Sequence, residues 1–329
     1  MDSDGPDTPL RRTLERIAAE AERAPSKHNT QPWRFLVRAD ALEVWPDPSR
    51  ILVETDPHQR ELVLSCAAAA ETALVLARAV GLETAVEVLP EGRGGALVRL
   101  RATGVRTASA GELALAGAVA GRHTDRGPLD AAPLGTQTPF VLQSAADRAG
   151  ATLHLVTSEG GRQTLSRLLL DADHRLAGRE PAGDELAEWS RAAGSTRQDG
   201  VPSTSTRGPR GSYASSFVQR DFSLPGSRAA HDRTGADTPL VGVLSTPGDT
   251  AADWVAAGRA LVQVLLELAL LGGTASYLNQ VVEVPDTRDA LQRELALAGR
   301  PQLVLRMGAG GPVASTPRRP VDDVVAQVL

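Results

Sequence analysis

The chain has 329 residues, of which 42% are hydrophobic and 23% are charged, and this composition excludes a disordered or minimal peptide. At about 150 residues per domain, the length suggests about two folding units. The 35 basic and 40 acidic side chains leave a net charge of −5, so no general positive field attracts nucleic acid or an anionic membrane, and we predict neither partner. No stretch approaches the roughly 18 uninterrupted apolar residues of a membrane span.

The first predicted element is a helix over residues 10–24, because apolar residues recur at helical spacing until Pro25 ends the run. A polar loop follows and leads into an alternating strand pair. A long Ala/Leu-rich helix then ends near Gly81, and strand and helix patterns alternate beyond it. The remaining predicted elements are strands at 34–38, 42–45, 84–89, 152–156, 240–245 and 303–307, and helices at 58–80, 111–120, 161–175, 184–193 and 253–271.

The segment 194–238 differs from the rest, because it is rich in Gly, Ser, Thr, Pro and Arg. A loop of this length inside a compact protein is typically either disordered or a lid. Its scattered apolar residues favour a lid that docks on the protein; they include Tyr213, Phe217, Phe222 and Leu224.

Two stretches of the chain follow the same plan of a buried helix, a glycine stop and a β run. One is 71–90, and the other is 258–285, whose predicted strand is the run 281–285. Two copies of one α+β unit would explain this echo, and so would convergence of common patterns. We predict a first half at 1–118 and a second half at 119–329, with the lid or flexible insertion at about 194–238.

Several familiar motifs are absent, and their absence removes reaction classes. The chain has no G-x-S-x-G elbow, Walker loop or H-E-x-x-H pair, and no G-x-G-x-x-G that follows a strand, so hydrolase, NTPase and Rossmann interpretations lose support. The single cysteine, Cys66, lies in an Ala-rich helical run and is typical of a buried small hydrophobe. The scattered histidines form no helical metal pair, so we predict no metal. The N-terminus shows no secretory signal, so we expect a cytoplasmic protein.

The candidate binding residues lie in short turns that carry arginine or amide groups. Arg122, Thr124 and Arg126 point the same way if the backbone is extended, and two guanidinium groups around a hydroxyl suit an anion. Arg318 and Arg319 lie on a stiff segment between prolines and could close on the same anion. The loop 25–33 holds short polar groups between two prolines and could contact the edge of a flat ligand. Taken alone, each arginine pair also fits a solvated surface, and the loop also fits a helix-to-strand connection without a ligand.

Three of these motifs resemble the FMN-dependent nitroreductase family. Residues 25–35, with the sequence PSKHNTQPWRF, resemble its P-S-x-x-N-x-Q-P-W-x-F signature. Residues 122–126 resemble its R-x-S-x-R element, and residues 317–321 resemble its C-terminal Arg-Pro phosphate clamp. Their order is reversed relative to an ordinary member, and together with the echo this resembles the fused, Acg-like branch. The resemblance implies an α+β fold with a mixed sheet flanked by helices, duplicated within one chain as a pseudo-dimer, with FMN at the junction of the halves.

The resemblance also implies roles for individual residues. Arg122, Thr124 and Arg318 would hold the FMN phosphate, and Arg126 would lie toward the pyrimidine edge. The loop 25–33 would reach the ring from the other half, and residues 277–281 would border the ring near N5. The complete set of predicted cofactor-binding residues is Ser26, Lys27, His28, Asn29, Gln31, Arg122, Thr124, Arg126, Asn279, Gln280, Arg318 and Arg319.

Three functions are open at this point. The first is an FMN oxidoreductase that passes hydride from a nicotinamide or another donor to an electron-poor small molecule such as a quinone or nitroaromatic. The second is a flavin-sequestering protein with a closed lid and little turnover. The third is a flavin-dependent dehydrogenase of a natural-product intermediate. Because the fused halves imitate the family dimer, a monomer could be complete.

Overall fold

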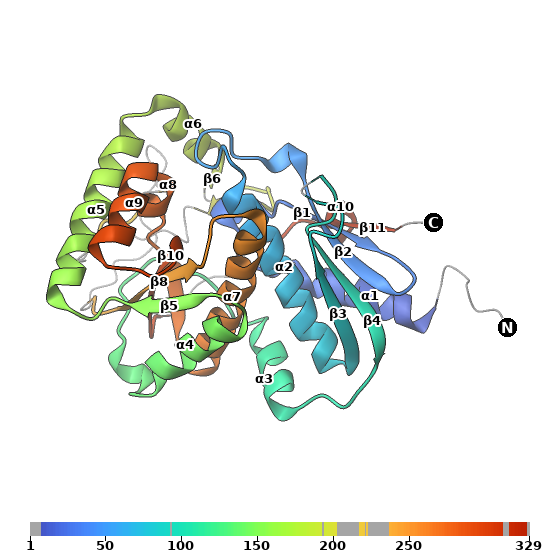
Figure 1. The fold of residues 1–329 in the computed structure, drawn as a ribbon. Coiled ribbons are helices and arrows are strands. Elements are labelled where there is room, and N and C mark those ends of the chain that lie inside the picture. Colours follow the sequence, from blue (N-terminus) through green and yellow to red (C-terminus); the bar gives the residue numbers. More distant parts are fainter. Residues whose placement is uncertain are drawn as a thin grey trace.

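A computed structural model describes residues 8–92, 94–192, 194–202, 217–220, 222, 237–311 and 316–327. These residues form two β-sheets with helices between and around them (Figure 1). The fold is therefore of the mixed α+β kind that the sequence predicts. Tyr213 and Leu224, two of the apolar residues assigned to a lid, lie outside the described residues.

The first sheet is mixed. The C-terminal strand pairs in parallel with β1 (Trp33–Val37), whereas the other neighbouring strands pair antiparallel. The C-terminal end of the described chain therefore completes the sheet that the N-terminal part of the chain builds. The strand order is β11 (Val325–Gln327), β1 (Trp33–Val37), β2 (Ala41–Pro46), β4 (Val98–Val105) and β3 (Leu82–Val88).

The second sheet is antiparallel throughout. Its strand order is β5 (Thr152–Leu155), β8 (Leu240–Thr246), β10 (Arg300–Gly308) and β9 (Thr274–Tyr277). The order β5-β8-β10-β9 has the same pattern as β1-β2-β4-β3 in the first sheet. In both sheets the second and third strands in chain order are joined through a long helix, α2 (Arg60–Ala79) or α7 (Ala251–Leu270).

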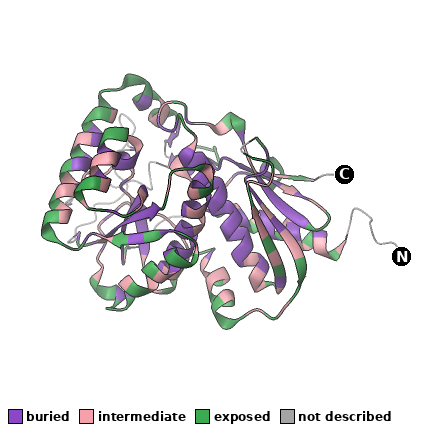
Figure 2. Ribbon diagram, viewed as in Figure 1, coloured by how far each residue is buried: buried purple, intermediate pink, exposed green. Residues whose placement is uncertain are grey.

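Helices α2 and α7 pack against each other in the centre of the molecule, between the two sheets (Figures 1 and 2). Gly258 of α7 lies against the backbone of Leu64 and the side chain of Ala67. Nearby, the buried Glu71 carboxylate of α2 accepts hydrogen bonds from Arg259 (2.6 Å) and Gln263 (2.7 Å). By length and composition α2 could cross a membrane, but 83% of its most apolar window is buried inside the protein.

The two sheets are covered differently, and their sequences reflect this. The first sheet packs one face on α1 (Pro9–Ala21) and α2, so β1 alternates between buried and more exposed residues. The second sheet has helices on both faces, so β8 and β10 are nearly continuous buried runs. The helices on it are α4 (Thr138–Arg148) and α7 on one face, and α5 (Glu159–Ala177), α8 (Gln280–Glu283) and α9 (Pro285–Glu294) on the other.

The strand predicted at 281–285 is wrong. The strand of that unit is β9, directly after Gly273, and residues 281–283 belong to the short helix α8. The run of valines has high β propensity, but Val281 and Val282 are buried in a core formed with α5, and packing overrides propensity. In the structure α2 is followed by β3 and α7 by β9, so the prediction misplaced the strand that follows the second helix.

Other boundaries also differ from the sequence patterns. The helix predicted at 184–193 is α6 (Glu180–Glu188), and it is followed by a short parallel ribbon of β6 (Ser190–Arg191) and β7 (Val201–Pro202). The patterns missed β4, α4 and α9 altogether. The helix α3 (Ala110–Ala118) follows β4, and α10 (Val321–Val324) precedes β11.

Candidate functional site

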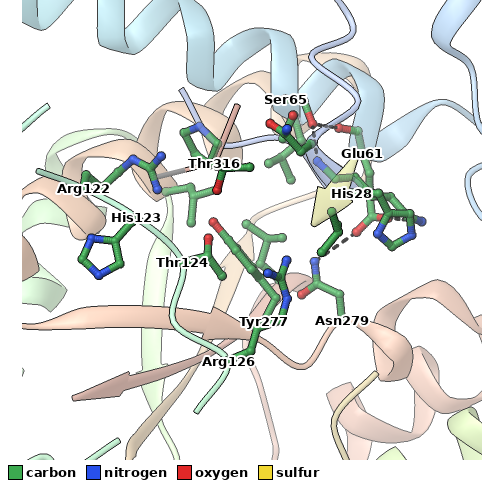
Figure 3. A pocket seen from close by; sticks show the side chains of 18 of the residues that line it. His28, Glu61, Ser65, Arg122, His123, Thr124, Arg126, Tyr277, Asn279 and Thr316 are labelled. Atoms are coloured by element: carbon green, nitrogen blue, oxygen red, sulfur yellow. Dashed lines mark hydrogen bonds and ion pairs between the residues drawn. The ribbon is translucent and has the colours of Figure 1, made fainter. Parts of the chain in front are cut away.

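A cavity of about 360 Å³ is lined in part by the two central helices, α2 and α7, and its volume is within the range of about 300–1,000 Å³ that is typical of small-molecule sites. The loop at 25–29 and one side of α2 form one part of its lining. Further lining comes from the segment 119–126, the end of β9 and the start of α8, while Thr316 and Arg318 come from the C-terminal segment (Figure 3).

The loop between α1 and β1 has an unusual backbone. His28, Asn29 and Gln31 all have positive φ angles, of 49°, 54° and 49°. Side-chain hydrogen bonds hold this conformation, because Ser26 Oγ accepts from the Gln31 backbone N–H (3.0 Å) and Thr30 Oγ1 donates to the Lys27 carbonyl (2.9 Å). Non-glycine residues in the left-handed region cluster at ligand-binding sites, where the surrounding structure maintains the strain.

Asn29 lines the cavity and also joins distant segments. Its amide donates to the carbonyls of Gly200 (3.0 Å) and Pro317 (3.1 Å), and its Oδ1 accepts from the Arg318 guanidinium (3.2 Å). Asn29 therefore positions Arg318 in addition to lining the site.

Gln31 and Arg319 do not line the cavity, in contrast to the expectation that both contact a ligand. The Gln31 amide donates to the Gln198 carbonyl (2.9 Å), and its Oε1 accepts from the Arg319 backbone N–H (2.8 Å). The buried Arg319 guanidinium forms an ion pair with Asp47 (3.4 Å) and donates to the Asp323 carbonyl. Both side chains therefore bind other parts of the chain, and they fasten the C-terminal segment to the loop.

Arg122, Thr124 and Arg126 line one end of the cavity together with Arg318. Thr124 forms an isolated parallel β-bridge with Ala275 of β9. The intervening Asp125 is fully buried and accepts hydrogen bonds from the backbone of Gly127 and Gly311. An extended backbone thus brings alternate side chains of this segment to the cavity.

The arginines of this end have few acidic neighbours. Arg122 and Arg318 both donate to the Arg23 carbonyl, at 3.0 and 3.1 Å, so their guanidinium groups lie close together. Neither forms an ion pair with a carboxylate in the part of the chain that the structure describes. Burial lowers the pKa of Arg122, lowers that of Arg126 to about 10, and, with repulsion from Arg122, lowers that of Arg318 to about 9. All three stay charged at neutral pH, so this end favours an anion.

The opposite wall carries a compact set of paired charges. Lys27, the only lysine of the sequence, contacts Glu61 of α2 (2.5 Å) and Glu283 of α8 (3.4 Å), and Arg220 contacts Glu283 (2.5 Å). Burial acts to lower the pKa of Lys27, but Glu283 and Glu61 outweigh it and the pKa is raised. The Asn279 amide donates to Glu61 (3.1 Å). Arg60 also contacts Glu61 (3.4 Å), so cations and carboxylates pair with each other here, in contrast to the arginine end.

Sequence reasoning missed Glu61, Glu283 and Arg220 as site residues. Two of them carried a visible signal, because Glu61 and Glu283 are charged residues at the edge of or inside apolar runs. Of the residues that were predicted, Gln280 is distinctive: it is 2% exposed, and its Nε2 has no hydrogen-bond partner among the described residues. The predicted residues that line the cavity are Ser26, Lys27, His28, Asn29, Arg122, Thr124, Arg126, Asn279, Gln280 and Arg318.

His28 is surrounded by cations. Its Nε2 accepts a hydrogen bond from Arg220 (3.1 Å), because a guanidinium can only donate. Burial first, and then the charges of Arg220, Lys27 and Arg126, lower the pKa of His28 well below its usual value. The imidazole is therefore neutral in the folded protein at neutral pH.

This neutrality predicts a pH effect on stability. Below about pH 6.5 the unfolded chain protonates His28 and the folded chain does not, so stability falls as the pH decreases, by up to about 1.4 kcal/mol per pH unit. Replacing His28→Gln removes this contribution. Urea unfolding at pH 7 and pH 5.5 is expected to show a smaller acid-dependent loss for the variant than for the wild type. The exposed His154→Gln serves as the control, and an equal loss in all three proteins contradicts the assignment.

Of the aromatic residues assigned to a lid, Phe222 lines the cavity. Its ring packs edge-on against His28, with centroids 5.4 Å apart, and the Arg126 guanidinium lies over it at 4.8 Å. Phe217 is buried instead in the core beside α5, with the Arg162 guanidinium 5.0 Å from its ring. Among the residues that the structure describes, no group of three or more His, Cys, Asp or Glu could hold a metal ion.

No protein-family model matches the chain, but individual proteins of Mycobacterium tuberculosis do. One, named provisionally as an NAD(P)H nitroreductase, is 30% identical over 324 residues, which cover 95% of this chain and 91% of the relative. A second, named provisionally as NAD(P)H nitroreductase Acg, is 27% identical over 332 residues, or 97% of each chain. A third, an uncharacterised protein, is 27% identical over 92% of this chain and 90% of its own length. With such a relative matched over nearly its whole length, and with the signature loop and arginine motifs gathered at one cavity, the chain belongs to the nitroreductase family.

Proposed function

We propose that this protein is an FMN-binding oxidoreductase that accepts hydride from NAD(P)H or another donor and passes it to an electron-poor small molecule such as a quinone or nitroaromatic. The observation that carries the proposal is the arginine end of the cavity. Arg122 and Arg318 are held close together there without a carboxylate partner among the described residues, next to a space of ligand size. A phosphate dianion supplies the charge that such a pair needs.

The residues present fit FMN. Arg122, Thr124 and Arg318 would hold the phosphate, and Arg126 would lie toward the pyrimidine edge. The Gln280 Nε2, which has no hydrogen-bond partner in the described part of the chain, offers a donor to an acceptor atom of the ring. Further walls come from Ser26, Lys27, His28, Asn29 and Asn279. Bound FMN would supply the hydride-accepting and hydride-donating centre, and the protein would bind and orient it.

The same proposal includes an internal duplication. It is supported by the shared strand order of the two sheets and by the paired central helices α2 and α7. In this view the junction of the halves takes the place of a dimer interface, so a monomer is sufficient for one site. The proposed setting is cytoplasmic, with small molecules as the only ligands.

The decisive test is anaerobic mixing of FMN-reconstituted protein with NADPH or NADH while the flavin absorbance near 450 nm is followed. We expect FMN to bind and its absorbance to bleach. Bound FMN that stays oxidised with both donors argues against nicotinamide-driven turnover. Failure to bind FMN overturns the proposal as a whole.

Phe222 favours a second candidate function, a protein that holds flavin with little turnover. The ring of Phe222 lies inside the cavity against His28 and Arg126, where it restricts the space open to a second ligand. Phe222→Ala is expected to speed NADPH-dependent bleaching, because the ring no longer restricts access of the donor to the cavity. The exposed Phe140→Ala is the control. Equal rates in wild type and Phe222→Ala contradict the holding function.

A further inference from the structure

Tyr277, the last residue of β9, presents an unused hydroxyl to the cavity. Its phenolic oxygen is buried, yet it has no hydrogen-bond partner among the described residues. In Figure 3 the ring extends from β9 across the cavity, with the hydroxyl directed toward the side of Thr124. A buried hydroxyl without a partner is unfavourable, so its partner is expected on a bound molecule.

The charges around Tyr277 define what that partner is. The charged groups that act on its phenol are Arg122 and Arg126. Burial raises the pKa of Tyr277, and the two arginines oppose this without overcoming it, so the hydroxyl keeps its proton. A protonated phenol beside two cations is a hydrogen-bond donor in a positive environment. This arrangement suits an anionic oxygen.

We propose that Tyr277 is a specificity-determining residue of the arginine end, whose hydroxyl donates a hydrogen bond to the phosphate of a phosphorylated flavin. This inference rests on the proposed FMN function and adds a residue to it, and for Tyr277 it replaces the expectation of a position near N5 of the ring. The paired charges of Lys27 and Glu61 on the opposite wall would face the uncharged part of the ligand. The contribution of Tyr277 therefore depends on the phosphate and not on the ring.

The test compares two flavins that differ by the phosphate. Dissociation constants for FMN and riboflavin are measured by quenching of flavin fluorescence, for wild type and Tyr277→Phe. We expect the variant to bind FMN about tenfold more weakly, as for loss of a hydrogen bond to a charged group, and riboflavin within about twofold of wild type. The ligand-free variant is expected to melt at the same temperature or higher, because the change deletes only an oxygen without a partner.

A cavity-lining aromatic that carries no hydroxyl provides the control. Phe222→Leu is expected to change the affinities for FMN and riboflavin by the same factor, so that their ratio stays at the wild-type value. Only Tyr277→Phe should reduce this ratio.

The outcomes separate this inference from the proposal beneath it. If Tyr277→Phe weakens both flavins equally, or neither, while wild type binds FMN, the phosphate contact is overturned and the FMN function stands. If wild type binds neither flavin, the FMN function fails and the inference fails with it. A lower melting temperature of ligand-free Tyr277→Phe would assign the hydroxyl a structural role instead.

Discussion

Replacing Arg122→Gln is expected to weaken FMN binding by at least about 30-fold, because removal of one partner of a buried charge pair costs about 2–5 kcal/mol. Arg122 is a sharper probe than Arg318. Among the described residues its guanidinium makes one hydrogen bond, to the Arg23 carbonyl, whereas Arg318 donates to several backbone carbonyls. The measurement is the dissociation constant of FMN, determined by fluorescence titration at fixed ionic strength.

For the ligand-free protein we do not expect Arg122→Gln to be destabilising. The lowered pKa of Arg122 shows that the folded state disfavours its charge, so neutralising it is expected to leave the unfolding free energy unchanged or raised. Arg148→Gln, which breaks an exposed ion pair with Glu267, is the matched control and should alter neither quantity by much. An Arg122→Gln protein that binds FMN like wild type would sink the assignment of the phosphate site.

Replacing Gly258→Ala is expected to destabilise the protein by about 2 kcal/mol or more, although alanine is the better helix former. A Cβ at this position would clash with the Leu64 carbonyl oxygen and lie 2.7 Å from the Ala67 Cβ, so α2 and α7 must move apart. Leu64 and Leu261, close to this crossing on either helix, line the cavity, so FMN affinity should fall as well. The checks are urea unfolding and FMN titration.

Gly183→Ala is the matched control for this change. Gly183 lies in α6, and, apart from its chain neighbours and the backbone of its own helix, no atom of the described residues lies within 4 Å of the Cβ that alanine would add. There the substitution is expected to stabilise by up to about 1 kcal/mol, through helix propensity alone. If both substitutions change the unfolding free energy equally, the packing of α2 on α7 does not require a glycine at position 258.

Local patterns were sufficient where one physical cause decides the structure. The mostly apolar runs of β8 and β10, interrupted in β10 by the buried Gln302 and Arg306, follow from burial on both faces. The alternation of Arg122, Thr124 and Arg126 follows from an extended backbone. The run 281–285 shows where such patterns fail. Its valines satisfy a strand or a buried helix equally well, and packing beside α5 selected the helix.

The signature loop shows the same limit for function. Asn29 and Gln31 were both expected at the ligand, yet Asn29 lines the cavity and Gln31 is bound to Gln198 and Arg319. Arg318 and Arg319 are adjacent in sequence, yet Arg318 lines the cavity and Arg319 pairs with Asp47. An amide or a guanidinium has the same donors in either role, so the residue type does not distinguish them.

The sequence by itself determined the α+β character, the positions of most helices and strands, and the motifs that supply donors for an anion. Tertiary structure alone decided which donors remain free for a ligand, because their competing partners are remote in the chain. The Asn29 amide, for example, bonds to a carbonyl 288 residues away. It also decided that Lys27, Glu61, Glu283 and Arg220 form one charge cluster, since only the packing of α2 and α8 around the loop brings these side chains within reach of one another.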